Sequence, residues 1–207
     1  MKKCFLSVVG LMMIFGTYAQ SAENGKDKKT TEKKLFMDVH EFAPGTVTFD
    51  AVMEAHKKDL KTGPKYGVDF QKFWVDEEKG RIYCLATAKK AEDITRAHAK
   101  AHGLVPKDIY EVKSNKDEAI VEGKDFFLDF HNVGAGHVTA DAVAGAHLKD
   151  LAVQNKYGVN LINYWLDEKN GVIFCLAQAK DSTALINTHK EAHGLVPNSV
   201  QKVKQGQ

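Results

Sequence analysis

The sequence lacks the short motifs that identify the commonest classes of enzyme. No stretch of the 207 residues forms a nucleophile elbow, a phosphate-binding loop, a Cys-x-x-Cys pair or the paired carboxylates of a glycosidase. The glycine-rich stretch Gly134-Ala135-Gly136 is answered by Ala43-Pro44-Gly45 at the equivalent place earlier in the chain, which disfavours a phosphate-binding role. We therefore expect a binding protein and not an enzyme.

The apolar run at the N-terminus, from residue 5 to residue 15, is too short to span a membrane. Lys2 and Lys3 give it a positive start, and Thr17-Tyr18-Ala19 before Gln20 forms a cleavage site. This arrangement predicts a secretory signal peptide over residues 1–19 and a soluble exported protein, which we place in the periplasm. An uncleaved N-terminal anchor is the alternative.

The mature chain also lacks net charge. Loss of Lys2 and Lys3 from the 29 basic residues leaves 27, which equals the number of acidic residues. We therefore expect neither nucleic acid nor, after signal cleavage, a membrane as a partner. Residues 20–34 are almost entirely polar and predict a flexible tether.

Cysteine is scarce, with three in the whole sequence. Cys4 precedes the apolar run and is lost with the signal peptide, whereas Cys84 and Cys175 lie inside the apolar stretches IYCLA and IFCLA. Free cysteines in such stretches are usually small buried hydrophobes. A disulfide between them would require the two stretches to meet, so we expect two free thiols.

What the sequence does contain is a tandem repeat. A shift of 91 residues lays residues 35–113 onto residues 126–204 without a gap, and roughly half of the positions are identical, which excludes chance. The chain is therefore predicted to hold two homologous units, joined by a polar linker over residues 114–125.

Hydrophobic periodicity within one unit alternates between strand and helix. Residues 91–102 form a predicted helix that ends at Gly103, where a left-handed conformation is expected. The predicted order is strand 35–42, a helix that begins at 48 or 50, strands 66–75 and 81–88 joined by a turn at 76–80, helix 91–102 and strand 109–112.

This βαββαβ order is that of a ferredoxin-like unit, an α+β fold with both helices on one face of a four-stranded sheet. A unit of this size has too small a core to leave the other face bare. We therefore predict that the two sheets pack together as an internal pseudo-dimer, similar to an α+β barrel.

Histidines recur four residues apart near the end of each unit. His98 and His102, like His189 and His193, are followed by Gly-Leu-Val-Pro. On a helix this spacing places two imidazoles on one face, where both can reach one divalent ion. Further ligands could come from the first helix of each unit, so the predicted metal ligands are His56, Asp59, His98, His102, His147, Asp150, His189 and His193.

Neutral imidazoles and carboxylates suit nickel, zinc or copper, and the order of affinities does not choose among them. No covalently bound cofactor is expected. A purely structural interpretation stays open, because His98 shares a helix face with Ile94 and His56 could pair with Asp59 as a local polar contact. Duplication repeats structural histidines as faithfully as functional ones.

A second candidate site lies on the first strand of each unit. Alternation puts Asp38 and His40 on one side and Met37 and Val39 on the other. We expect the apolar pair to face the helices, which would send the polar pair between the two sheets. The residues of this second candidate site are Asp38, His40, Asp129 and His131. They could bind a metal or a small ligand, or they could form a buried ion pair.

The ordered motifs A-H-x-x-D-L, K-Y-G-V, W-x-D-E and H-x-x-x-H-G-L-x-P resemble the bacterial domain-of-unknown-function 4242 family in both units. That resemblance implies a ferredoxin-like fold and nickel binding. We therefore expect a periplasmic protein that binds a divalent transition metal, nickel by resemblance. The alternative is an α+β-barrel enzyme or small-ligand binder that uses His40 and His131 between the sheets. Further association into a homo-oligomer stays open.

Overall fold

A computed structural model describes residues 32–207. The predicted signal peptide, residues 1–19, and the predicted tether up to residue 31 lie outside the described residues. Within residues 32–207, no helix is both long and apolar enough to cross a membrane.

Both repeats fold in the predicted βαββαβ order, with one extra turn of 3-10 helix, η1, in the first. The first repeat contains β1 (Lys34–Glu41), α1 (Phe49–Thr62), η1 (Gly63–Tyr66), β2 (Asp69–Asp76), β3 (Arg81–Ala88), α2 (Ala91–Ala101) and β4 (Asp108–Ser114). The second contains β5 (Asp125–Asn132), α3 (Ala140–Tyr157), β6 (Asn160–Asp167), β7 (Val172–Ala179), α4 (Ser182–Ala192) and β8 (Ser199–Gly206).

Local sequence explains where the helices begin and end. The Thr48 hydroxyl accepts a hydrogen bond from the backbone N–H of Ala51, which satisfies a free donor in the first turn of α1. Gly103 follows α2 with a φ of +82°, the left-handed conformation that its position predicts. Pro64 lacks a backbone N–H, so the first repeat turns into η1 where α3 of the second repeat continues as one helix.

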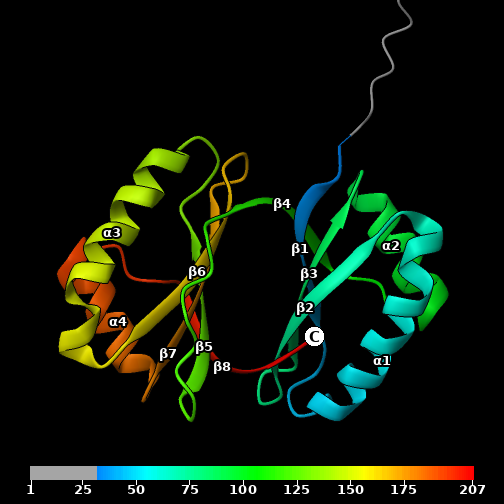
Figure 1. Ribbon diagram of the computed structural model, residues 1–207, viewed down its shortest axis with the longest axis horizontal. Coiled ribbons are helices and arrows are strands. Elements are labelled where there is room, and N and C mark those ends of the chain that lie inside the picture. The colour runs from blue at the N-terminus through cyan, green and yellow to red at the C-terminus, as the bar shows by residue number, and fades with distance from the viewer. Residues whose placement is uncertain (1–31) are drawn as a thin grey trace, which may run out of the picture. The chain divides into compact units, whose positions relative to one another are not determined.

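The eight strands close into one barrel in the order β1-β3-β2-β8-β5-β7-β6-β4. The last strand of each repeat crosses to the hairpin of the other, so β4 pairs with β6 at Ser114 and Trp165, and β8 pairs with β2 at Gln205 and Trp74. The two sheets therefore face each other with the helices outside, as the crossing strands in Figure 1 show. The predicted pseudo-dimer is confirmed.

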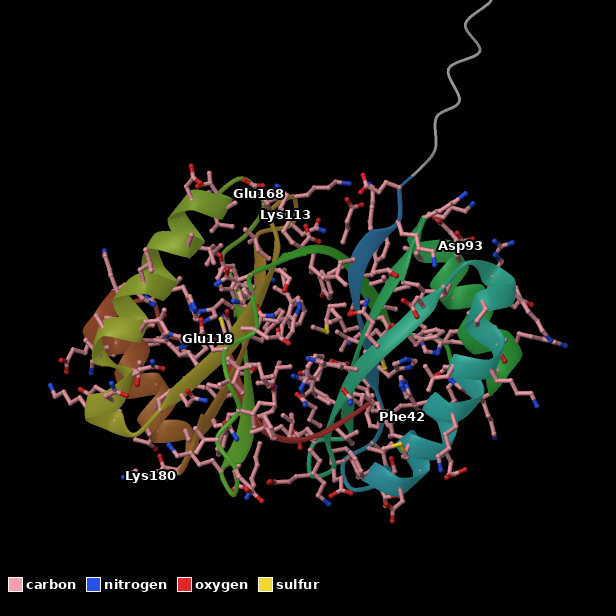
Figure 2. All side chains as sticks on the ribbon, in the orientation of Figure 1. Phe42, Asp93, Lys113, Glu118, Glu168 and Lys180 are labelled. Carbon is pink, nitrogen blue, oxygen red and sulfur yellow. The ribbon has the colours of Figure 1, made fainter. Side chains whose placement is uncertain are left out.

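Apolar side chains from both sheets fill the barrel (Figure 2). Trp74 and Trp165 meet there with ring centroids 5.0 Å apart, and Met37 and Val39 lie in the same cluster. The prediction that Met37 and Val39 face the helices is therefore wrong. The alternation along β1 was correct, but its sides were reversed, because the enclosed barrel interior excludes charged groups more strongly than the layer beneath the helices does.

Candidate functional site

Because the polar side of β1 faces the helices, all of the predicted site residues of the first repeat lie in one place, between the sheet and its two helices. Asp38 and His40 project from β1 toward α1 and α2, where they meet the histidines and the aspartate of the helices. We call this group the first cluster; it comprises Asp38, His40, His56, Asp59, Cys84, His98 and His102. Its repeat, the second cluster, comprises Asp129, His131, His147, Asp150, Cys175, His189 and His193.

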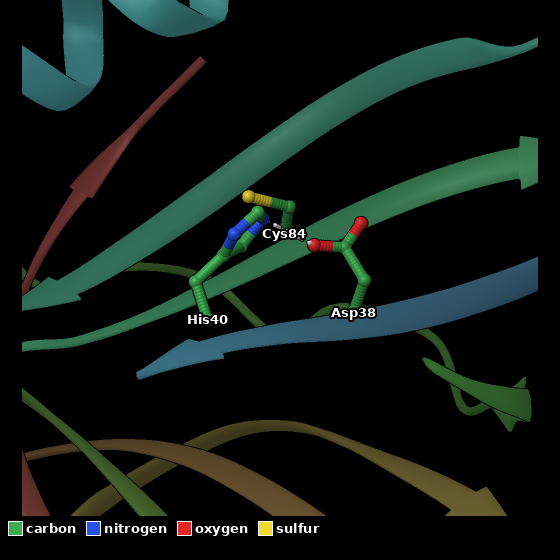
Figure 3. Close-up of side chains that lie close together, drawn as sticks. All are labelled: Asp38, His40 and Cys84. Carbon is green, nitrogen blue, oxygen red and sulfur yellow. Dashed lines mark ion pairs between the residues drawn. The ribbon is translucent and has the colours of Figure 1, made fainter. Parts of the chain in front are cut away.

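His98 is the centre of the first cluster. Its Nδ1 lies 3.0 Å from Asp59 Oδ1 and its Nε2 lies 3.4 Å from Asp38 Oδ2. His102 Nε2 lies 3.1 Å from Asp59 Oδ1 and 3.2 Å from Asp59 Oδ2, and His40 Nε2 lies 3.1 Å from Asp38 Oδ1. A chain of alternating imidazoles and carboxylates therefore joins β1, α1 and α2. Figure 3 shows its strand-borne end, where Asp38 and His40 lie beside Cys84.

The second cluster repeats this chain. His189 Nδ1 lies 3.0 Å from Asp150, and His189 Nε2 lies 3.1 Å from Asp129. His193 and His131 approach the outer oxygens of the same two carboxylates at 3.2 and 3.0 Å. One difference is that His98 Nδ1 also lies 3.2 Å from His102 Nε2 in the first cluster.

The four residues of the predicted second site do not lie between the sheets. Asp38, His40 and their counterparts Asp129 and His131 belong to the same clusters as the helix histidines. The alternative function had placed His40 and His131 between the sheets, whereas both line the cavities on the helix-facing sides of their sheets. His102, at the end of α2, has a side chain that is only 8% exposed.

Burial and hydrogen bonding act against each other on the central histidine. Burial alone would lower the pKa of His98, but its hydrogen bonds to Asp38 and Asp59 outweigh burial and raise the pKa to about 9. The same balance raises the pKa of His189 to about 10. A protonated imidazole therefore lies between two carboxylates in each cluster at neutral pH.

The carboxylates respond in the opposite direction. Burial would raise the pKa of Asp38, but its contacts with His40 and His98 lower it to about 2. The pKa of Asp129 is lowered to about 2 in the same way by His131 and His189. Burial lowers the pKa of His56, with partial compensation from Asp59, so its imidazole is neutral. Burial lowers the pKa of His147 in the same way, so each cluster contains an ionised carboxylate, Asp38 or Asp129, and a neutral imidazole, His56 or His147.

Several buried polar atoms of the clusters have no partner in good hydrogen-bond geometry: Asp38 Oδ1, Asp129 Oδ1, His56 Nε2 and His131 Nδ1. Buried polar atoms rarely stay unsatisfied, so such atoms indicate a missing ligand, ion or water. Within residues 32–207, no lysine or arginine forms an ion pair with the four cluster aspartates. Among the described residues, these carboxylates are therefore paired with imidazoles alone, a donor set that suits a transition-metal ion.

Four groups of side chains bring three potential ligand atoms within 4.8 Å of one another. They are Asp59 with His98 and His102, Asp38 with His40 and Cys84, Asp129 with His131 and His189, and Asp150 with His189 and His193. His56 and His147, which we predicted as ligands, lie beside these groups and belong to none of them.

Cys84 and Cys175 are the site residues that sequence reasoning missed. Both are free thiols, as predicted, but each lies on the helix-facing side of its sheet and not simply in a hydrophobic core. Burial, and then the nearby Asp38, raise the pKa of the Cys84 thiol well above its usual value. The pairing register of β1 and β3, which places Asp38 directly opposite Cys84, is what brings the thiol into the cluster.

The fold and the clusters define a tandem α+β barrel with one buried histidine–aspartate cluster in each half. The family model described as "Nickel responsive protein SCO4226-like" matches residues 36–112 and again residues 127–203, so the chain belongs to the SCO4226-like family. The resemblance to a nickel-related family is confirmed at that level. No curated protein matches the sequence.

Solved structures similar to this chain include SCO4226 from Streptomyces coelicolor A3(2), which is 38% identical over 38% of this chain and 94% of its own, with a TM-score of 0.36. A putative monooxygenase from Lactobacillus acidophilus NCFM is 10% identical over 84% of this chain and 94% of its own, with a TM-score of 0.47. A heme-binding protein from Thermus thermophilus is 8% identical over 85% of this chain and 91% of its own, with a TM-score of 0.41.

Proposed function

We propose that this protein binds divalent transition metal, one ion in each half of the barrel, and that nickel is the physiological metal. The observation that carries the proposal is the convergence, twice in one chain, of two carboxylates and at least three imidazoles in a buried place without a lysine or arginine partner. The family description supports nickel as the first metal to test.

In the first half, His98, His102 and Asp59 are the ligands we assign, with Asp38 and His40 as further donors beside them. In the second half the corresponding residues are His189, His193 and Asp150, with Asp129 and His131. Imidazole and carboxylate donors suit nickel, zinc and copper. His56 and His147 complete the polar surroundings and are not assigned as ligands.

The proton on His98 supports this assignment, because it supplies the positive charge that the two carboxylates require when no metal is bound. A divalent ion would replace that proton and leave the cluster better neutralised. The structural alternative is that the cluster binds no metal, and that the protonated histidine and its carboxylate partners serve only to hold both helices on the sheet.

Calorimetric titration of metal-free, untagged protein with nickel, zinc and copper separates the two alternatives. We expect two ions per chain and a proton released with each. Elemental analysis of untagged protein from its native source identifies the metal carried in the cell. Absence of saturable binding by all three metals would leave only the structural role.

From the sequence we further propose that the protein acts outside the cytoplasm, in the periplasm, after removal of residues 1–19. The charge and length of that segment support the proposal. Binding, and not catalysis, is the proposed activity, because the sequence contains no catalytic motif that would use the clusters.

A further inference from the structure

Each half of the barrel has a cavity whose floor is its cluster and whose walls are apolar. The first cavity has a volume of about 250 Å³ and lies between β1, the side of α1 and the end of α2. Its walls include Phe42, Val52, Phe73 and Ile82, while His40, His56 and His98 face it from the floor. Apolar walls with a few convergent polar groups are the usual composition of a small-molecule site.

The floor of each cavity contains an imidazole nitrogen that no protein group satisfies. His56 is 3% exposed and its Nε2 has no hydrogen-bond partner; in the second cavity, the same is true of His131 Nδ1. Such a nitrogen can accept a hydrogen bond from a hydroxyl group or donate one to it, depending on the tautomer. The unsatisfied nitrogens therefore specify a polar group on whatever fills the cavity.

The walls limit the charge of the occupant. No lysine or arginine lines either cavity in the part of the chain that the structure describes. Asp59 and Asp150 lie at the floors, so an organic acid would face a carboxylate without a free cation to pair with. An uncharged molecule is neither repelled by the carboxylate nor left as a buried charge without a partner.

The two cavities have diverged at three equivalent positions. Phe42, Thr46 and Phe73 of the first cavity are replaced by Val133, His137 and Tyr164 in the second. The smaller valine is consistent with the larger second cavity, about 390 Å³, and the histidine and tyrosine make its walls more polar. Phe42 lies at the end of β1 near α1, as Figure 2 shows.

We propose that each cavity binds a small uncharged aromatic molecule that carries one hydroxyl group, a phenol. The hydroxyl bonds to the unsatisfied imidazole nitrogen of the floor, His56 Nε2 in the first cavity and His131 Nδ1 in the second, and the ring packs against the apolar walls. The second cavity accepts a larger or more polar phenol than the first. This inference goes beyond metal binding and does not depend on it, because the contacts involve only side chains of the chain itself.

Fluorine NMR titration of metal-free protein with 4-fluorophenol, fluorobenzene and 4-fluorobenzoate tests the proposal. We expect saturable binding of 4-fluorophenol at two sites, binding of fluorobenzene weaker by roughly fivefold, the value of one hydrogen bond, and none of the benzoate. His56→Phe should abolish the preference for the phenol at the first site only.

Ala51 and Ala142 are exposed positions on α1 and α3 that border the cavities, so Ala51→Trp and Ala142→Trp should each remove one site without loss of the fold. Lys58→Trp, at an exposed position of α1 that does not border the cavity, is the matched control. Unchanged binding in the double tryptophan variant, equal affinity for phenol and fluorobenzene, or binding that requires nickel would each overturn the proposal. Nickel binding by the same variants is measured separately, so the two proposals can fail independently.

Discussion

Metal-free protein should lose stability as the pH rises from 6 to 10, because His98 and His189 give up their protons in that range. The pKa of His98 is raised from 6.5 to about 9 by its two carboxylate partners. A group whose folded pKa is raised stabilises the fold fully below its unfolded pKa and loses that contribution as the pH rises through the folded pKa. The window of loss is therefore about pH 6.5 to 9 for His98.

The magnitude follows from the size of the shift. A rise of two to three pH units, at about 1.4 kcal/mol per unit, corresponds to about 3 kcal/mol for His98. His189, whose pKa is raised to about 10, contributes a similar or larger amount. The lowered pKa of Asp38 reports the same ion pairs and is not added. Since domains are typically stable by about 5–15 kcal/mol, loss of both contributions would remove a large part of the total.

Urea unfolding at pH 6, 7.5, 9 and 10 in the presence of a chelator measures this loss. The control is the double variant His98→Gln and His189→Gln, in which the dependence between pH 6.5 and 9 should largely disappear. Saturating nickel should reverse the trend, because metal competes better as protons leave. A stability that stays flat from pH 6 to 10 in the parent protein would refute the assigned protonation of both histidines.

Three further outcomes are expected. Asp59→Asn should weaken nickel binding in the first half by about tenfold or more and, because it leaves the His98 and His102 donors poorly paired, cost about 1–3 kcal/mol of stability without metal, measured by calorimetry and urea unfolding. Division of the chain near Glu118 should yield halves that aggregate or re-pair, seen by light scattering, since each would expose the sheet face that now lines the barrel; two stable monomers would contradict this. Mass spectrometry of native protein should find a chain that begins near residue 20, with Cys84 and Cys175 reactive only after denaturation.

The fold could be predicted from the sequence because two independent patterns agreed. The repeat fixed the equivalence of the units, and the periodicity within one unit fixed the order of its elements. The packing of the two sheets against each other could be predicted because a unit of this size cannot leave one face of its sheet bare. The crossing of β4 and β8 to the opposite hairpins could not be predicted, because strands with buried faces on both sides have no sequence signal for their partner.

The candidate site was predicted only in pieces. The helix histidines and Asp59 were found from helical spacing, but Asp38 and His40 were sent to the wrong side of β1, because Met37 and Val39 fit either face of a sheet that is covered on both. Cys84 was missed because an isolated cysteine in an apolar strand has the same appearance in a core and in a site. Spacing along the chain shows which side chains share a face, and it cannot show which face meets which layer.

Metal binding by the doubled histidine–aspartate clusters is tested most directly by nickel calorimetry of the double variant His102→Ala and His193→Ala. His137→Thr is the matched control, because it removes a histidine outside the clusters and installs the residue found at the equivalent position, Thr46. We predict that the double variant loses affinity by at least about tenfold at both sites while the control binds as the parent does. Parent-like nickel affinity in the double variant would contradict metal binding at these clusters.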